Sequence, residues 1–144
     1  MAKLVISTLG AMQITDGKSP LSGFLSDKVR GLLIYLAVEQ ARPFRREALA
    51  ALFWPDQPEK GSRANLRRAL ANLRLVIDDE NDHFLLITRQ TLQFNAASNA
   101  VVDAIRFEQL LSGREPSVVQ MKEAASLVNG CFLENFSIHG LSLI

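Results

Sequence analysis

One stretch in the middle of the chain decides the fold, residues 62–78, which read SRANLRRALANLRLVID. The stretch contains no glycine or proline and is rich in strong helix formers, so it predicts a helix over residues 62–77. Four apolar residues recur at helical spacing and form one narrow stripe that faces the core, namely Leu66, Leu70, Leu73 and Ile77. The polar residues away from this stripe are Arg63, Arg67, Arg68, Asn72 and Arg74. The outer face of the helix is therefore expected to be cationic.

The charges of the chain are unevenly placed around this helix. The net charge is only +1, but residues 42–74 hold eight basic side chains against three acidic ones. An acidic cluster follows directly, with Asp78, Asp79, Glu80 and Asp82. Acids at the C-terminal end of a helix oppose its dipole, so this cluster is interpreted as a polar connector rather than a cap. The distribution predicts a protein with one basic face.

The flanking sequence predicts short elements on both sides of the basic helix. Alternation near residues 4–8 and 12–14 indicates two strands, and an apolar stripe from Asp27 to about Glu39 indicates a helix with Ser26 or Asp27 as N-cap. A short helix over residues 49–53 is ended by Pro55. Residues 84–88 and 91–95 form a hairpin around Arg89-Gln90, although this tip lacks the glycine that such turns favour. Beyond a boundary at 96–99, two more helices are expected near 102–111 and 121–128.

Strands, three helices and a hairpin follow one another in the order of a winged helix-turn-helix. The predicted fold class is α+β, with a winged helix-turn-helix domain over residues 1–97 and an incomplete α-helical segment over 98–144. In such a fold a helix enters the major groove of DNA, where arginine pairs with guanine and asparagine with adenine. The hairpin, residues 84–95, would act as the wing and bring Arg89 to the DNA backbone or the minor groove.

The residues resemble the Streptomyces antibiotic regulatory proteins (SARPs). The strongest resemblance lies in residues 45–56, RREALAALFWPD, and 62–74, SRANLRRALANLR, and is supported by Leu9-Gly10 and by residues 28–37, KVRGLLIYLA. A weaker likeness, in residues 102–111 and 130–136, is similar to the opening of the TPR-like bacterial transcriptional activator domain that follows the winged helix in that family. Only the start of such a domain is present, which favours a chain truncated from a longer regulator.

The resemblance implies a DNA-binding transcription regulator, an activator, that reads duplex DNA with helix 62–77. The expected DNA-facing residues are Arg63, Arg67, Arg68, Asn72, Arg74, Arg89, Trp54 and Arg45. Arg67 and Asn72 are the candidates for base contacts, and Arg63, Arg68 and Arg74 for phosphates. Trp54 is expected either to donate its indole N–H to a phosphate or to pack in the core. Arg46 fits a phosphate contact or an internal ion pair equally well.

The resemblance also implies that the loop over residues 55–61 touches RNA polymerase, and it leaves a homodimer open. The competing interpretation is a winged helix that docks an acidic protein partner and has no specific DNA binding, since a fold does not fix a function.

Catalysis, metal binding and membrane insertion are not expected. The lone cysteine, Cys131, has no activating neighbours and excludes an intrachain disulfide, while His83 and His139 lack further ligands at metal-binding spacing. No phosphate-binding glycine loop is present, and no cofactor is implied. The longest apolar run is too short to span a bilayer and residues 1–6 do not form a signal peptide, so a cytoplasmic protein is expected.

Overall fold

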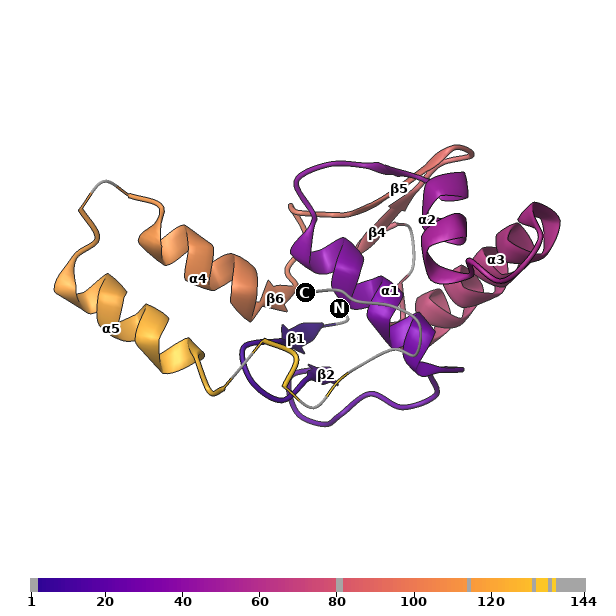
Figure 1. Ribbon diagram of the computed structural model, residues 1–144. Coiled ribbons are helices and arrows are strands. Elements are labelled where there is room, and N and C mark those ends of the chain that lie inside the picture. Colours follow the sequence, from indigo (N-terminus) through magenta and orange to yellow (C-terminus); the bar gives the residue numbers. More distant parts are fainter. Residues whose placement is uncertain (1–2, 80–81, 114, 131, 135, 137–144) are drawn as a thin grey trace. The chain divides into compact units, whose positions relative to one another are not determined.

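The computed structural model describes residues 3–79, 82–113, 115–130, 132–134 and 136 (Figure 1). These residues form a mixed α and β fold with five helices and two three-stranded sheets. They divide into two compact units, the first consisting of residues 21–98 and the second of residues 3–20 together with 99–136. The expected domains, 1–97 and 98–144, stay a prediction, and the structure groups residues 3–20 with the later part of the chain.

The first unit contains helices α1 (Asp27–Val38), α2 (Arg46–Phe53) and α3 (Glu59–Val76). The hydroxyl of Ser26 accepts a hydrogen bond from the backbone N–H of Val29, so Ser26 is the N-cap of α1. Helix α2 buries Leu49, Ala50 and Phe53, while Leu52 is 39% exposed.

Helix α3 confirms the central sequence prediction. The apolar stripe of Leu66, Leu70, Leu73 and Ile77 is buried. The helix begins at Glu59 rather than at Ser62, with Pro58 at the N-cap position and an acid in its first turn. A negative side chain there interacts favourably with the helix dipole, which helps to explain the earlier start.

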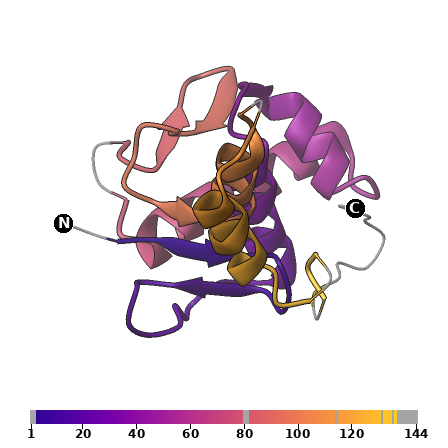
Figure 2. The same ribbon diagram turned by 90° about the vertical axis from the view of Figure 1, so that its left-hand side faces the viewer.

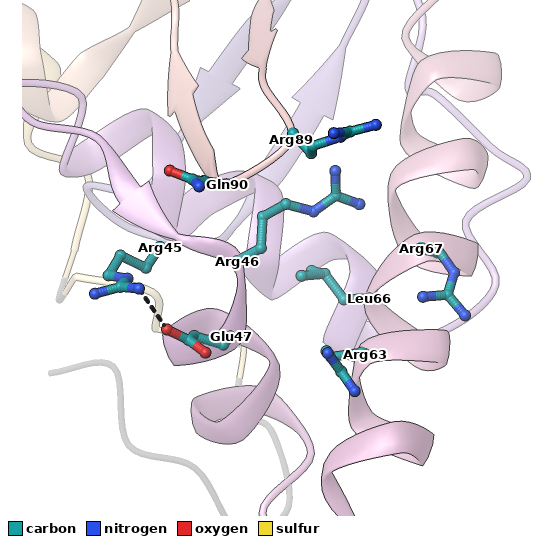
Figure 3. Close-up of a pocket in the computed structure, with 8 residues that line it drawn as sticks. All are labelled: Arg45, Arg46, Glu47, Arg63, Leu66, Arg67, Arg89 and Gln90. Atoms are coloured by element: carbon teal, nitrogen blue, oxygen red, sulfur yellow. Dashed lines mark ion pairs between the residues drawn. The ribbon is translucent and has the colours of Figure 1, made fainter.

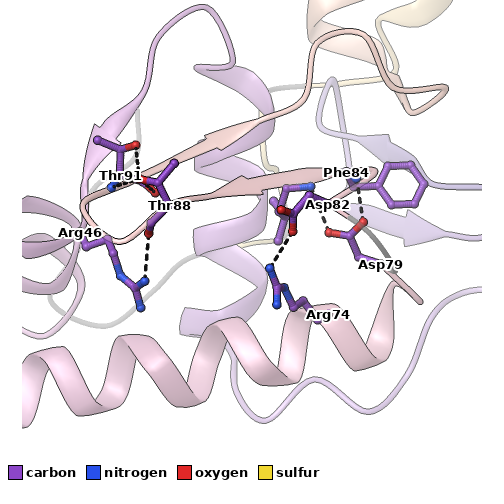
Figure 4. Close-up of polar contacts among 8 residues, drawn as sticks. Arg46, Arg74, Asp79, Asp82, Phe84, Thr88 and Thr91 are labelled. Carbon is purple, nitrogen blue, oxygen red and sulfur yellow. Dashed lines mark hydrogen bonds and ion pairs between the residues drawn. The ribbon is translucent and has the colours of Figure 1, made fainter.

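The acidic connector after α3 is an ordered end of the helix and corrects part of its interpretation. Asp78 takes a left-handed conformation with φ of 53°, and the N–H of Asp79 donates to the carbonyl of Arg74 at 2.9 Å. An α-helix often ends in this way, with one residue in the left-handed conformation directly after its last turn. The carboxylate of Asp79 is buried and accepts the backbone N–H groups of Phe84 at 2.7 Å and Leu85 at 3.1 Å (Figure 4). Asp79 thus joins the end of α3 to the start of the hairpin. Glu80 lies outside the described residues.

The hairpin belongs to a three-stranded antiparallel sheet in the order β3-β5-β4. Its strands are β4 (Leu85–Ile87) and β5 (Thr91–Phe94), with Ile87 opposite Leu92. A third strand, β3 (Phe44–Arg45), pairs with β5 and leads directly into α2. The sequence did not predict β3, because two residues carry no detectable alternation.

The second unit holds strands β1 (Val5–Ser7), β2 (Gln13–Thr15) and β6 (Val101–Val102), followed by helices α4 (Asp103–Leu111) and α5 (Val118–Leu127). Its sheet has the order β2-β1-β6, with β1 antiparallel to β2 and parallel to β6. Figure 2 shows β1 and β2 running side by side, and α4 and α5 form an antiparallel pair (Figure 1). The N-terminal strands were expected within the first domain and Val102 within a helix. In the structure, β1 instead pairs with β6 of the later part of the chain, and Val102 lies in β6.

Asp103 ties β1 to α4 inside the second unit. Its carboxylate accepts the N–H of Thr8, the hydroxyl of Thr8 and the N–H of Leu9, each at 2.8 Å. Gly10 follows with φ of 133°, and a Cβ there would lie 3.1 Å from the backbone of Asn129. Leu9-Gly10, part of the family resemblance, is therefore a place of close backbone approach.

No helix among the described residues is long and apolar enough to cross a bilayer. Cys131 and His139 lie outside the described residues.

Candidate nucleic-acid interface

A cationic cleft of about 400 Å³ opens in the first unit between the start of α2, the outer face of α3 and the tip of the hairpin (Figure 3). The residues that line it are Arg45, Arg46, Glu47, Arg63, Leu66, Arg67, Arg89 and Gln90. Five arginines thus face one acid around a single apolar side chain. These arginines come from strand β3, helix α2, helix α3 and the tip of the hairpin, so the concentration of positive charge is made by the tertiary fold.

Helix α3 contributes Arg63 and Arg67, which lie one turn apart and are exposed. Within the described part of the chain, no acidic side chain pairs with Arg63, Arg67 or Arg89. Three guanidinium groups in one cleft, without an acidic partner among the described residues, favour an anionic ligand with several negative groups. Arg63, Arg67 and Arg89, three of the predicted site residues, are therefore brought together.

Arg45 is the fourth predicted residue at the cleft. It pairs with Glu47 at 2.8 Å, and its side chain is 74% exposed (Figure 3). Ion pairs this exposed contribute little to stability, so the guanidinium can exchange Glu47 for another anion at small cost.

Arg46 was considered in the sequence but left out of the predicted DNA-facing set, and the structure places it in the cleft. Its Nη1 donates to the carbonyl oxygen of Thr88 at 3.1 Å (Figure 4). The internal ion pair that the sequence left open is not formed with any described acid. The sequence signal that could have placed Arg46 in the site was its position directly after Arg45, at the start of α2. That signal could not show that the hairpin tip lies close to it.

Asn72 corrects the predicted site. Its side chain is 9% exposed, its Oδ1 accepts the N–H of Leu25 at 2.9 Å, and its Nδ2 donates to the carbonyl of Gly23 at 2.9 Å. The amide is therefore occupied at both ends by the loop that precedes α1. The expectation that Asn72 faces outward to read a base is wrong, because the loop covers this part of α3.

Arg68 and Arg74 are exposed residues of α3 that do not line the cleft. Arg68 donates to the Oδ1 of Asn65 one turn earlier. Arg74 forms an ion pair of 2.7 Å with Asp82, and both side chains are 45% exposed (Figure 4). The phosphate contacts expected of these two residues stay predictions. A phosphate would compete with Asp82 for the guanidinium group of Arg74.

Trp54 follows the last residue of α2 and is half-buried. Its ring lies 6.2 Å from that of Phe53, which in turn packs at 5.9 Å from Tyr35. The aromatic ring therefore extends a cluster at the edge of the core, which is the packing role weighed in the sequence. Its contact with a phosphate stays a prediction.

The fold matches that of a solved structure, Mycobacterium tuberculosis EmbR in complex with a low affinity phosphopeptide, with a TM-score of 0.70. The two chains are 24% identical, and the match covers 92% of this chain and 38% of the EmbR chain. The likeness shows that this chain shares its mixed α and β fold with part of the EmbR chain. No protein-family model matches the chain. No curated protein matches it either.

The described residues contain no group of three or more His, Cys, Asp or Glu side chains that could hold a metal ion. The polar chemistry of the cleft is that of guanidinium groups, which form paired hydrogen bonds with phosphate oxygens.

Proposed function

We propose that this chain is a DNA-binding transcription regulator of the SARP type, and that the cationic cleft with the exposed face of α3 is its DNA-binding surface. The observation that carries the proposal is the convergence on one cleft of Arg45, Arg46, Arg63, Arg67 and Arg89, which come from four segments of the first unit. The fold likeness to EmbR supports it. In this proposal α3 enters the major groove, and the hairpin follows the backbone beside it.

The five arginines have separate tasks in the proposal. Arg63 of α3 and Arg89 of the hairpin tip both line the cleft and act as phosphate ligands, which position the protein without reading sequence. Arg67 is the residue of α3 that contacts a base, since Asn72 is held by the loop before α1. Arginine in the major groove pairs with both acceptors of guanine, so we expect a preference for a G·C pair opposite Arg67.

The proposal extends to the rest of the regulator. The chain is a cytoplasmic, non-enzymatic activator that needs no cofactor, and residues 55–61 contact RNA polymerase. These residues form the loop before α3 and its first turn, and most of them are exposed. A homodimer would place two copies of α3 on a repeated operator.

The test is binding to random-sequence duplex DNA over a range of salt concentrations, measured by fluorescence anisotropy. Each phosphate contact contributes about −0.9 to the slope of log affinity against log salt. We expect the double variant Arg63→Ala, Arg67→Ala to bind more weakly and to lower the magnitude of this slope by about 1 to 2. Circular dichroism verifies that the variant is folded.

A matched control is the double variant Arg30→Ala, Arg106→Ala. It removes the same charge from arginines that lie outside the cleft, each paired with an acid on its own unit. We expect its DNA affinity to stay within about twofold of the unmutated chain, since exposed pairs contribute little. Salt-insensitive binding, or equal losses in both double variants, would contradict the proposal and favour an acidic protein as partner.

A further inference from the structure

The tip of the hairpin turns without glycine. It consists of Thr88, Arg89, Gln90 and Thr91, and the N–H of Thr88 donates to the carbonyl of Thr91 at 2.9 Å. Among the described non-glycine residues, positive φ occurs only at Asp78, Asp82 and Leu133, so neither Arg89 nor Gln90 is left-handed. The turns that usually close short hairpins need left-handed residues. This tip must be held in another way.

The hydroxyl of Thr88 supplies the missing turn contacts. Its oxygen accepts the N–H of Gln90 at 3.2 Å and the N–H of Thr91 at 2.8 Å. The Oγ1 atoms of Thr88 and Thr91 also lie 2.8 Å apart (Figure 4). A hydroxyl oxygen accepts two hydrogen bonds, so the two backbone N–H groups use its full accepting capacity. One side chain therefore satisfies both donors on the far side of the turn.

Arg46 holds the same tip from α2. Its backbone N–H donates to the carbonyl of Gln90 at 2.9 Å, and its Nη1 donates to the carbonyl of Thr88 at 3.1 Å. The two carbonyls belong to the residues on either side of Arg89. The backbone that carries Arg89 is thus anchored before and after it, and Arg89 extends from the anchored tip toward α3 (Figure 3).

We propose that Thr88 is a positioning residue, whose hydroxyl acts with Arg46 to hold Arg89 in the cationic cleft for a DNA phosphate. This inference rests on the proposed function and names a residue that acts on DNA only through Arg89. An arginine on an unanchored tip loses backbone freedom when it binds, and an arginine on an anchored tip has lost it already. The hydroxyl of Thr88 therefore raises the affinity that Arg89 provides.

The test compares two isosteric variants that change no charge. Thr88→Val removes the oxygen that accepts both N–H groups, whereas Thr91→Val removes the neighbouring hydroxyl and leaves that acceptor in place. We expect Thr88→Val to weaken DNA binding by about three- to tenfold, since the net loss equals one or two neutral hydrogen bonds. Thr91→Val should stay within about twofold of the unmutated chain.

Repeating both variants in an Arg89→Ala background separates positioning from direct contact. If Thr88 acts through Arg89, the effect of Thr88→Val disappears once Arg89 is absent. If the hydroxyl touched DNA itself, the two losses would add, and additivity would overturn the inference. An unchanged affinity of Thr88→Val in the presence of Arg89 would overturn it as well.

A measurement without DNA distinguishes this inference from the proposed function. In the free protein, amide hydrogen exchange of Gln90 and Thr91 should be faster in Thr88→Val than in Thr91→Val. Equal exchange in the two variants overturns the inference, even if the unmutated chain binds DNA tightly. Failure of the unmutated chain to bind DNA overturns the proposed function, together with the role of Thr88 in binding.

Discussion

Asn72 illustrates how a single amide can join a helix to a loop far away in the sequence. It offers an acceptor to Leu25 and a donor to Gly23, and its side chain is nearly buried. When one partner of a buried hydrogen bond is removed, the remaining polar group bonds neither to the protein nor to water. The free energy lost in this way is larger than the net contribution of the hydrogen bond to stability. Asn72 is therefore a structural residue of α3.

We expect Asn72→Ala to lower the free energy of unfolding by about 1 to 3 kcal/mol, because the N–H of Leu25 and the carbonyl of Gly23 lose their partners. Urea denaturation measures this loss. The control is Asn65→Ala, because Asn65 contacts the exposed side chain of Arg68. Its effect should stay below about 1 kcal/mol. Unchanged stability of Asn72→Ala, with weaker DNA binding, would return Asn72 to the DNA-facing set.

Asp79 holds the start of the hairpin through two charge-assisted hydrogen bonds to the N–H groups of Phe84 and Leu85. In Asp79→Asn one oxygen becomes an NH₂ group that faces a donor, so we expect a loss of about 2 kcal/mol in the free energy of unfolding. Asp78→Asn is the matched control, because asparagine also tolerates the left-handed conformation found there. Equal thermal stability of the two variants would contradict the assigned role of Asp79.

The sequence predicted which arginines line the cleft more successfully than it predicted the surroundings of Asn72 and Asp79. Arg63 and Arg67 were expected on the outer face of the helix because helical spacing is a local property, and Arg89 was expected at the tip of the hairpin. Asn72 and Asp79 were misinterpreted because their partners, the loop around Gly23 and the strand beginning at Leu85, approach through tertiary structure. Nothing in the local pattern of α3 indicates which polar positions such a loop will cover.

At the scale of the elements, the ion pair between Arg74 and Asp82 links the last turn of α3 to the segment before β4. Both side chains are half exposed, so the pair contributes less than about 1 kcal/mol to stability. The pair matters more for charge, because it neutralises an arginine on the helix that we propose to enter DNA.

Asp82→Asn should therefore raise the affinity for random-sequence DNA by about two- to fourfold at low salt, with little change in thermal stability. Asparagine suits the positive φ of residue 82. Glu123→Gln is the control, because it releases Arg106 from a similarly exposed pair outside the cleft. An equal increase in both variants would show that net charge alone acts, and that Arg74 has no special position.

The periodicity of the sequence predicted the helices well and the short strands poorly. The stripes of α1 and α3 extend over several turns, so their existence followed from spacing alone. Strands β3 and β6 have two residues each and are defined only by their partners. Helix α3 started earlier than expected because Glu59 suits the first turn, a signal that was present but not used.

At the scale of the whole molecule, Asp103 is expected to stabilise only the second unit and not the first. Asp103→Ala removes the acceptor of the N–H groups of Thr8 and Leu9, so we expect their amide exchange to become faster and the unit to lose about 2 kcal/mol of stability. The first unit keeps its own core, and DNA affinity should stay within about twofold. Hydrogen exchange and anisotropy on one sample measure both effects. A parallel loss of DNA binding would contradict the assignment of the site to residues 21–98.

The parallel pairing of β1 with β6 has a consequence for the order in which a ribosome makes this protein. Val5 and Ile6 are translated before residues 21–98, and their partners Val101 and Val102 are translated only after them. At about 5–20 residues per second, the first strand waits several seconds for its neighbour. The cleft-bearing unit can complete its core during that time. Its arginines would then be in place on the nascent chain before β1 and β6 have paired.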